Sequence, residues 1–360
     1  MVIDRNLQNW CIVQMSSFSR KSEHLELARK AQVDSCRRDK RFNYEPLFAA
    51  HPLPNQPYNV TKPLLLGSKK ISSPLWISSM TGGGRDSDKI NNRLAHAANR
   101  FGLGMGMGSC RSLLNSTERL EDFQLRPILG SELPLFINLG VAQIEQLLAS
   151  GKTNRINWLI ETLDADGLII HINPLQEALQ PEGDRFTRPA IETISELLAS
   201  ANYPIIVKEV GQGFGPKSLT ALIELPLAAL EFGALGGTNF TRLEGIRPYN
   251  HKKSLQDLET VGHSATEMVL QINQILDTLG NRAKCSQFII SGGIDSFRSG
   301  YYLINTLNSP AIYGQAAAIL EHAAISQESL DLYIQTELEG LALLNAFCSI
   351  NMNSREREQL

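Results

Sequence analysis

The segments DGLIIHIN (166–173) and YPIIVKEVG (203–211) decide the fold of this chain. Each contains a short, almost uninterrupted apolar run, and each then changes abruptly to polar residues or glycine. Such a run is typical of a strand in a parallel sheet, because helices cover that sheet and leave no solvated face. The polar residues therefore mark the carboxyl ends of two buried parallel strands.

Six further runs have the same character, and segments of helical length separate them. They are PLWISSM (74–80), GLGMGMGS (102–109), LPLFINLG (133–140), LAALEFGALGG (227–237), QFIISGG (287–293) and AIYGQAA (311–317). The intervening segments 87–100, 188–200 and 264–279 carry apolar residues three and four apart, which predicts amphipathic helices. Eight strand–helix units in roughly 250 residues predict an α/β protein with a (β/α)8, or TIM, barrel.

The regions outside the eight runs predict three parts of the chain. Residues 1–70 form an N-terminal arm, with a helical stretch at 24–33 and a proline-rich stretch at 51–63. Residues 71–325 form the barrel. Residues 326–360 form a C-terminal helix, at 328–347, and a charged tail that we expect to fray.

Composition excludes several classes of protein. Hydrophobic residues make up 42% of the 360 residues and charged residues 20%, which is typical of a globular chain with a sizeable core. The net charge of -3 provides no field for holding nucleic acid. Five scattered cysteines without paired spacing predict a reducing, cytoplasmic location. The N-terminus lacks a signal-peptide core, and no run approaches the ~18 apolar residues that span a bilayer, so we expect no membrane association.

Glycine-rich turns follow the last three predicted strands. In a barrel the carboxyl ends of all strands converge on one mouth, where active sites are built. Turns of this kind let backbone N–H groups approach a phosphate, although any one of them could be a plain turn. We expect a phosphate of a cofactor or substrate beside Gly236-Gly237-Thr238, Gly292-Gly293 and Gly314-Gln315-Ala316.

Lys208 follows four apolar residues and so lies at the end of a buried strand. Burying an ammonium group costs free energy unless it has a partner. A structural explanation would need a salt bridge with a neighbour such as Glu209 or Glu231. The functional alternatives are a Schiff-base lysine, as in barrel aldolases, or a cation that stabilises negative charge on a bound ring.

The segment HINPLQEALQPEGD (171–184) concentrates polar residues directly after a buried strand. His171 and Asn173 are two apart and face the same side of an extended strand. Glu177 and Asp184 are candidate Mg²⁺ ligands, since this ion prefers oxygen ligands shared with a phosphate. Arg111 follows another strand end, and its guanidinium suits a phosphate. The alternative for the segment is a solvated loop.

Seven motifs taken together resemble the type 2 isopentenyl diphosphate isomerases. They are RKxxH at 20–24, SSMTGG at 78–83, MGSxR at 107–111, NLG at 138–140, HINPLQEALQPEGD at 171–184, VKEVG at 207–211 and GGTN at 236–239. The family consists of FMN-dependent (β/α)8 barrels that interconvert isopentenyl and dimethylallyl diphosphate, using Mg²⁺ and a flavin reduced by NADPH or NADH. The resemblance implies a cytoplasmic homo-oligomer, a tetramer or octamer.

The resemblance also implies a role for individual residues. The flavin ring would contact Met80, Thr81, Gly82, Ser109 and Asn138, with Lys208 on the side of its N1 and O2 atoms. The FMN phosphate would lie against Thr238, Gly292, Gly293, Gly314, Gln315 and Ala316. The substrate site would comprise Arg20, Lys21, Ser109, Arg111, Asn173 and Gln176, with Glu177 binding Mg²⁺. The catalytic residues would be Gln176 and His171.

The basic residues of the N-terminal arm also allow a different interpretation. Taken alone, Arg20, Lys21 and His24 form a basic helical face of the kind that is usually solvated. In the resemblance they bring the N-terminal arm to the substrate site.

The resemblance also implies a mechanism. Reduced FMN would take part in proton transfer through N5, with Gln176 on the other side of the substrate and no net redox change.

The chain departs from the family pattern after the seventh and eighth strands. Many relatives continue SGGI with an arginine and an alanine-rich helix, whereas this chain reads SGGIDSFRSGYYLINTLNSP. In the eighth strand, YGQAAAIL replaces the commoner GLARPFL. Asp295 would repel a phosphate unless it points away and caps a helix. Cys110 replaces a frequent glutamine, for which we have no account.

Three other functions are compatible with a phosphate-binding barrel. An FMN-dependent oxidoreductase of the hydroxy-acid oxidase type would need an HGxR motif near the later strands, which is not seen. A Schiff-base aldolase would use Lys208 without flavin. A non-catalytic barrel would bind a phosphate ligand and turn nothing over.

Overall fold

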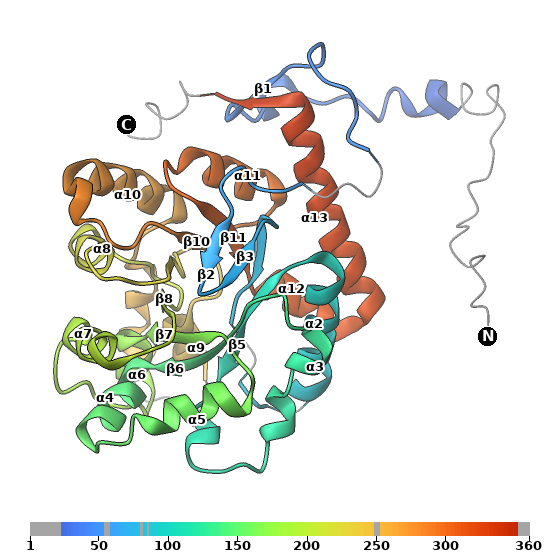
Figure 1. Ribbon diagram of the computed structural model, residues 1–360. Coiled ribbons are helices and arrows are strands. Elements are labelled where there is room, and N and C mark those ends of the chain that lie inside the picture. Colours follow the sequence, from blue (N-terminus) through green and yellow to red (C-terminus); the bar gives the residue numbers. More distant parts are fainter. Residues whose placement is uncertain (1–22, 54–57, 80–81, 85, 248–252, 352–360) are drawn as a thin grey trace, which may run out of the picture. The chain divides into compact units, whose positions relative to one another are not determined.

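The computed structural model describes residues 23–53, 58–79, 82–84, 86–247 and 253–351. Contacts divide the chain into Tyr44–Ile350 and a smaller unit made of the segments on either side. The larger unit contains a closed barrel of eight parallel strands with helices around its outside (Figure 1). The predicted fold class is therefore confirmed.

All eight predicted strand runs form barrel strands. The barrel closes because β11 pairs with β4, where Tyr313 is the register partner of Leu75. In chain order the strands are β4 (Leu75–Ile77), β5 (Gly104–Ser109), β6 (Leu135–Gly140), β7 (Gly167–Ile172), β8 (Ile205–Glu209), β9 (Ala229–Glu231), β10 (Phe288–Ser291) and β11 (Ala311–Gln315).

The helices predicted at 87–100, 188–200, 264–279 and 328–347 are also present. The helices are α2 (Ser87–Phe101), α3 (Arg126–Leu129), α4 (Val141–Ala149), α5 (Asn154–Thr162), α6 (Pro174–Leu179), α7 (Ala190–Ser200), α8 (Pro216–Ile223), α9 (Phe240–Ile246), α10 (Ala265–Leu279), α11 (Phe297–Thr306), α12 (Ala317–Ile325) and α13 (Gln327–Phe347). Short 3-10 helices are η1 (Ser35–Arg37), η2 (Arg111–Leu114), η3 (Leu120–Phe123), η4 (Lys253–Thr260) and η5 (Gly280–Arg282). Short strands are β1 (Phe42–Tyr44), β2 (Leu64–Leu66), β3 (Lys69–Ile71) and β12 (Cys348–Ile350).

The helix predicted at 24–33 is shorter than expected. Among the described residues it covers 23–27, and turns follow. The side chains from 23 to 33 are exposed, so no apolar face is buried to support a longer helix. A single short helix without packing is marginal in water, and periodicity alone overestimated its length.

Two layers of side chains fill the barrel interior. Residues that face inward from the strands, such as Trp76, Phe136 and Ile206, pack against Leu64 and Leu66 of the β2–β3 hairpin. Side chains alternate along a strand, so the residues two positions further on face the same interior nearer the mouth. This second layer is polar and comprises Ser78, Asn138, His171, Lys208, Glu231 and Ser291. The apolar layer holds the barrel together, and the polar layer forms the floor of the mouth.

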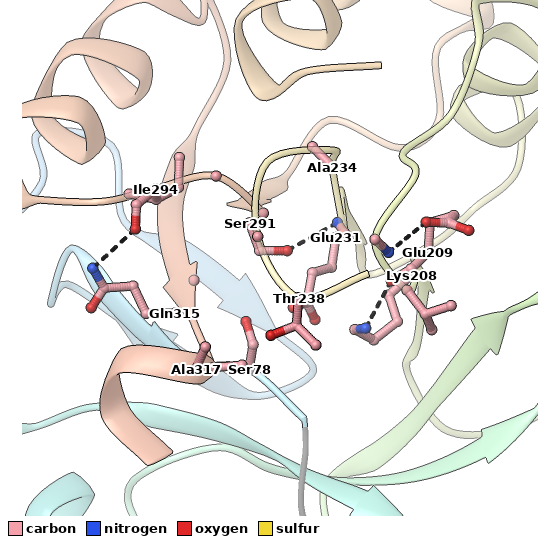
Figure 2. Close-up of a pocket in the computed structure, with 18 of the residues that line it drawn as sticks. Ser78, Lys208, Glu209, Glu231, Ala234, Thr238, Ser291, Ile294, Gln315 and Ala317 are labelled. Atoms are coloured by element: carbon pink, nitrogen blue, oxygen red, sulfur yellow. Dashed lines mark hydrogen bonds between the residues drawn. The ribbon is translucent and has the colours of Figure 1, made fainter. Parts of the chain in front are cut away.

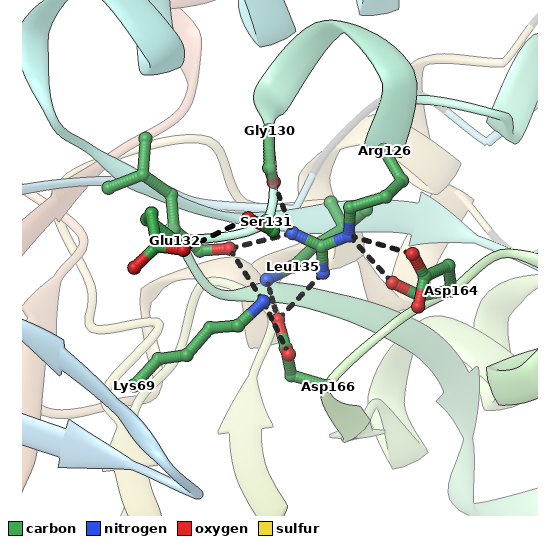
Figure 3. A network of polar contacts seen from close by, with 9 residues as sticks. Lys69, Arg126, Gly130, Ser131, Glu132, Leu135, Asp164 and Asp166 are labelled. Atoms are coloured by element: carbon green, nitrogen blue, oxygen red, sulfur yellow. Dashed lines mark hydrogen bonds and ion pairs between the residues drawn. The ribbon is translucent and has the colours of Figure 1, made fainter.

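A network of ion pairs joins the β2–β3 hairpin to the amino-terminal end of the barrel (Figure 3). Asp166 Oδ1 lies 2.7 Å from Lys69 Nζ, and Asp166 Oδ2 lies 2.8 Å from Arg126 Nη2. Asp166 also accepts a hydrogen bond of 2.8 Å from the N–H of Leu135 at the start of β6. Arg126 in turn donates to the carbonyl oxygen of Leu133. One carboxylate therefore ties three segments together.

Candidate active site

Two neighbouring cavities open at the carboxyl ends of the strands. The first, which we call the glycine-rich cavity, is shown in Figure 2. The second, which we call the polar cavity, lies beside it. Ser79, Lys208, Val210 and Phe240 line both, so the two cavities share a wall.

The structure brings most of the predicted site residues together. The glycine-rich cavity is lined by Lys208, Thr238, Gly292, Gly293, Gly314, Gln315 and Ala316. The polar cavity is lined by Ser109, Arg111, Asn138, His171, Asn173, Gln176, Glu177 and Lys208. Gly82 packs against Ser109, where an added Cβ would lie 3.1 Å from the backbone nitrogen. Arg20, Lys21, Met80 and Thr81 lie outside the described residues.

The turn after β10 can be made only by glycine. Gly292 has a φ of +88°, and a Cβ there would lie 2.1 Å from the carbonyl oxygen of Ala234. Across the cavity, α12 begins at Ala317 without a side-chain cap on its first N–H groups, and Ala317 and Ala318 line the cavity. Uncapped N–H groups at the start of a helix favour an anion. The cavity thus has the donor set of a phosphate site.

The side chain of Gln315 points away from the phosphate cradle predicted for it. Its Oε1 accepts a hydrogen bond of 2.9 Å from the hydroxyl of Tyr333. Its Nε2 donates to Glu337 Oε2 and to the carbonyl oxygen of Ile294, each at 3.4 Å (Figure 2). Side chains alternate along β11, so Gln315 faces α13 and only its backbone is left for the cavity.

Asp295 is held at the start of α11. Its Oδ1 accepts hydrogen bonds from the hydroxyls of Ser299 at 2.6 Å and Ser296 at 3.1 Å. A carboxylate in this position interacts favourably with the helix dipole. The N-cap residue of α11 is Ser296, which makes no side-chain capping hydrogen bond, so Asp295 lies beside the helix start without the capping role considered for it.

Lys208 is buried at the end of β8, and 7% of its surface is exposed. Its Nζ donates a hydrogen bond of 2.8 Å to the backbone oxygen of Glu209. Among the described residues no nitrogen–oxygen contact within 4.0 Å joins Lys208 Nζ to the carboxylate of Glu209 or Glu231, so a direct salt bridge does not explain this buried lysine. Because Lys208 lines both cavities, the remaining N–H donors of its ammonium group lie at the wall that the cavities share.

The carboxylate of Glu209 has a separate, structural role. Its Oε2 accepts the backbone N–H groups of Gly211, Gln212 and Gly213, at 2.8, 2.5 and 2.9 Å. Burial raises the pKa of Glu209 to about 6, against the opposing effect of these hydrogen bonds and of Lys208. The loop after β8 therefore folds around a buried acceptor.

His171 is a neutral imidazole. Its Nδ1 lies 2.7 Å from Asn138 Oδ1, an acceptor, so Nδ1 carries the hydrogen and Nε2 keeps its lone pair. Burial lowers the pKa of His171 to about 3, and the charges of Lys208 and Arg111 add to the effect. At neutral pH this side chain accepts hydrogen bonds at Nε2 and does not act as an acid.

Gln176 is oriented by neighbours on both sides. Asn173 Nδ2 donates to Gln176 Oε1 at 3.0 Å, and Gln176 Nε2 donates to Glu244 Oε1 at 3.4 Å. Glu244 is buried on α9 and accepts a hydrogen bond of 2.7 Å from Arg247. Sequence reasoning missed Glu244 and also Phe240, since both follow GGTN on a short helix without any motif of their own.

Glu177 and Asp184, the candidate metal ligands, have different surroundings. Glu177 lines the polar cavity, and its oxygens accept from Asn173 Nδ2 at 3.0 Å and from the N–H of Asp184 at 2.7 Å. Asp184 forms an ion pair of 2.9 Å with Arg111. Within the described residues no cluster of three or more metal-ligating side chains exists. A single carboxylate fits Mg²⁺ only where a substrate supplies further oxygens.

The fold and the two cavities define a class of protein: a parallel (β/α)8 barrel with two adjoining cavities at its mouth, one lined by glycine-rich turns and the other by polar side chains. Solved structures share this fold. A double mutant of flavocytochrome b2 with pyruvate bound has a TM-score of 0.57 at 11% identity, covering 85% of this chain and 72% of that one. A mandelate oxidase mutant with an FMN monooxide adduct has a TM-score of 0.50 at 13% identity, covering 84% and 88%.

Curated relatives are closer in sequence. The isopentenyl-diphosphate delta-isomerase of Synechococcus sp. is 34% identical over 352 residues, which cover 95% of each chain. That of Rickettsia typhi is 32% identical over 331 residues, covering 92% of this chain and 93% of the other. No family model matches the chain. At this identity and coverage, the chain belongs to the isopentenyl-diphosphate delta-isomerase family.

In the part of the chain that the structure describes, none of the helices combines the length and the apolar character that a bilayer span requires.

Proposed function

We propose that this enzyme interconverts isopentenyl and dimethylallyl diphosphate, with FMN in the glycine-rich cavity and the substrate in the polar cavity. The observation that carries the proposal is the shared wall: Lys208 lines both cavities, so one buried cation reaches a cofactor ring and a substrate at once. Family membership supports the proposed reaction. The geometry of the two adjoining cavities supports separate positions for the cofactor and the substrate.

The residues of the glycine-rich cavity fit FMN. The turn at Gly292, the start of α12 and the adjacent Thr238 supply backbone and hydroxyl donors for a phosphate. Ser78 and Ser79 have buried hydroxyls without a hydrogen-bond partner among the described residues, which suits the polar edge of a flavin ring. Ser109 and Asn138, which line the polar cavity, would contact the ring together with Gly82, Met80 and Thr81, so the ring would extend along the shared wall into the polar cavity. Reduced FMN, when bound, supplies a proton-transfer group at N5 that ordinary side chains lack.

The diphosphate would be held at the outer side of the polar cavity. Arg111, half exposed, is the described cation there, and Arg20 and Lys21 of the N-terminal arm would add to it. Glu177 would bind Mg²⁺ together with diphosphate oxygens. Since Arg111 is paired with Asp184, substrate binding would exchange one anionic partner for another.

His171 and Gln176 would position the hydrocarbon part of the substrate. The neutral imidazole would face it without adding positive charge beside a developing tertiary cation. Gln176, fixed by Asn173 and Glu244, would hold or move the proton on the side away from the flavin. Phe240, on the shared wall, would help to exclude water from that cation.

The finer assignments belong to the same proposal. NADPH or NADH would reduce the flavin, and the enzyme would work in the cytoplasm as a tetramer or octamer. Native mass spectrometry of the full chain tests the number of subunits, and initial rates with each nucleotide test the preference.

The deciding experiment is anaerobic incubation of the full chain with isopentenyl diphosphate, FMN, Mg²⁺ and NADPH, followed by detection of dimethylallyl diphosphate. Omitting FMN or the reductant should abolish turnover, and omitting Mg²⁺ should raise KM for the diphosphate. Product formation without flavin would contradict the proposal. Flavin reduction by lactate or mandelate, with no isomerisation, would favour the hydroxy-acid oxidase alternative.

A further inference from the structure

Glu231 presents an unsatisfied carboxylate to the floor of the glycine-rich cavity (Figure 2). The residue ends β9 and none of its surface is exposed. Neither Oε1 nor Oε2 has a hydrogen-bond partner among the described residues. A buried ionisable group without a partner is costly and rare, so its presence requires a compensating charge or a ligand.

The charges around Glu231 leave one candidate. β9 lies between β8 and β10, and the register partners of Glu231 are Lys208 on one side and Ile289 on the other. In the described lining of the cavity, the titratable side chains are Lys208, Glu209 and Glu231. Glu209 accepts three backbone N–H groups and is also acted on by the charge of Lys208. Glu231 is the carboxyl group of this described lining that has no hydrogen-bond partner, and Lys208 is its register partner on the adjacent strand.

We propose that Glu231 is the counter-charge of Lys208 and that it lowers the reduction potential of the flavin bound above them. This inference rests on the proposed FMN site. Glu231 offsets the charge of the Lys208 ammonium, so an oxidised, neutral ring can bind without an isolated ammonium beneath it. The two residues do not form a direct ion pair, which leaves the Lys208 ammonium oriented by the Glu209 carbonyl and available to a ligand.

The expected effect on the flavin follows from electrostatics. Reduction places negative charge on the ring whenever the reduced form is anionic, and Lys208 favours that charge while Glu231 opposes it. In a buried cavity of low dielectric, a unit charge on a neighbouring strand has a large effect. Glu231 therefore acts on the flavin through its charge and takes no part in the proton transfers.

The first test measures the potential of the bound flavin in the full-length holoenzyme. Electrons are supplied by xanthine and xanthine oxidase, in the presence of a dye of known potential. Glu231→Gln should increase the affinity for reduced relative to oxidised FMN at least about tenfold, which is about +30 mV for a two-electron couple. Lys208→Gln should shift the potential the other way. Glu145→Gln, a buried carboxylate on α4 bound to Thr187 outside the cavity, should leave it unchanged.

The second test needs no flavin and uses thermal unfolding of the flavin-free full chain. Lys208→Gln should lower Tm because it leaves the Glu231 carboxylate without a counter-charge. Adding Glu231→Gln should recover part of that loss, whereas two independent sites would only add their effects. A double variant less stable than Lys208→Gln, or an unchanged potential in Glu231→Gln, would overturn the inference. Failure of the unmodified chain to bind FMN would instead contradict the proposed function.

Discussion

At the scale of the residue, His171 shows how surroundings change a chemical role. A histidine at a strand end suggests an acid or base near neutral pH. Burial beside Lys208 and Arg111 lowers its pKa to about 3, and the hydrogen bond to Asn138 selects the tautomer. The side chain is therefore a hydrogen-bond acceptor at Nε2 and offers no positive charge to a diphosphate at neutral pH.

The depressed pKa of His171 makes stability depend on pH. Unfolded histidine takes up a proton below about pH 6.5, whereas folded His171 stays neutral down to about pH 3. The contribution of His171 to the free energy of unfolding is therefore fully present above about pH 6.5. As the pH falls from there toward 3, the free energy of unfolding decreases by about 1.4 kcal/mol per pH unit. In urea titrations between pH 7 and pH 4, His171→Asn should flatten this loss. His96→Asn, at an exposed position on α2, should not.

Gln176 is the residue on which the proposed proton transfer depends most directly. Gln176→Ala should reduce kcat about 100-fold or more, because a positioned group is lost from the substrate side facing away from the flavin. The absorption spectrum of bound FMN should stay nearly unchanged, since Gln176 is not among the residues proposed to contact the flavin ring. The control is Gln274→Ala, on the exposed face of α10. Normal isomerisation by Gln176→Ala would remove this residue from the catalytic assignment.

At the scale of the element, the Asp166 carboxylate fixes the β2–β3 hairpin to the amino-terminal end of the barrel through Lys69. Asp166→Ala leaves Lys69 and Arg126 as two poorly solvated cations, and their side chains are only 17% and 10% exposed. Breaking such a buried network typically costs about 3 kcal/mol. We expect a loss of that size in the free energy of unfolding, measured by urea denaturation. Asp164→Asn should change little, since the Asp164 carboxylate is 82% exposed and 3.8 Å from Arg126, and asparagine tolerates the φ of +47° at this position.

Helix α13 supports the proposed phosphate loops from outside the barrel. Glu337 accepts hydrogen bonds from Phe297 N–H at 3.2 Å, the Tyr313 hydroxyl at 3.0 Å and Gln315 Nε2 at 3.4 Å. It thereby joins the loop after β10 to the end of β11.

Loss of these contacts should loosen the FMN site without touching FMN. Glu337→Ala should raise the Kd for FMN about tenfold, or about 1.4 kcal/mol, measured by quenching of flavin fluorescence on binding. Glu339→Ala, exposed on the same helix, is the matched control and should bind FMN normally. Equal affinity in both variants would show that the helix does not position the loops.

At the scale of the whole molecule, much of the architecture was predictable from local patterns. Buried parallel strands are read from apolar runs such as LII before His171, and the amphipathic period of 264–279 predicts α10. The helix start there is also local: Ser264 and Glu267 form a reciprocal capping box. Residues 24–33 are the exception, because a helical period does not specify whether anything packs against it.

The sequence by itself determined the eight-strand barrel and the set of polar side chains at its mouth, because strand and helix periods and the order of strand ends are local properties. Only the tertiary structure decided what each side chain does there. It turned Gln315 toward α13, paired Arg111 with Asp184, made His171 neutral, and left Glu231 buried opposite Lys208. These outcomes depend on neighbours distant in sequence and on desolvation by all of them together, which no single motif records.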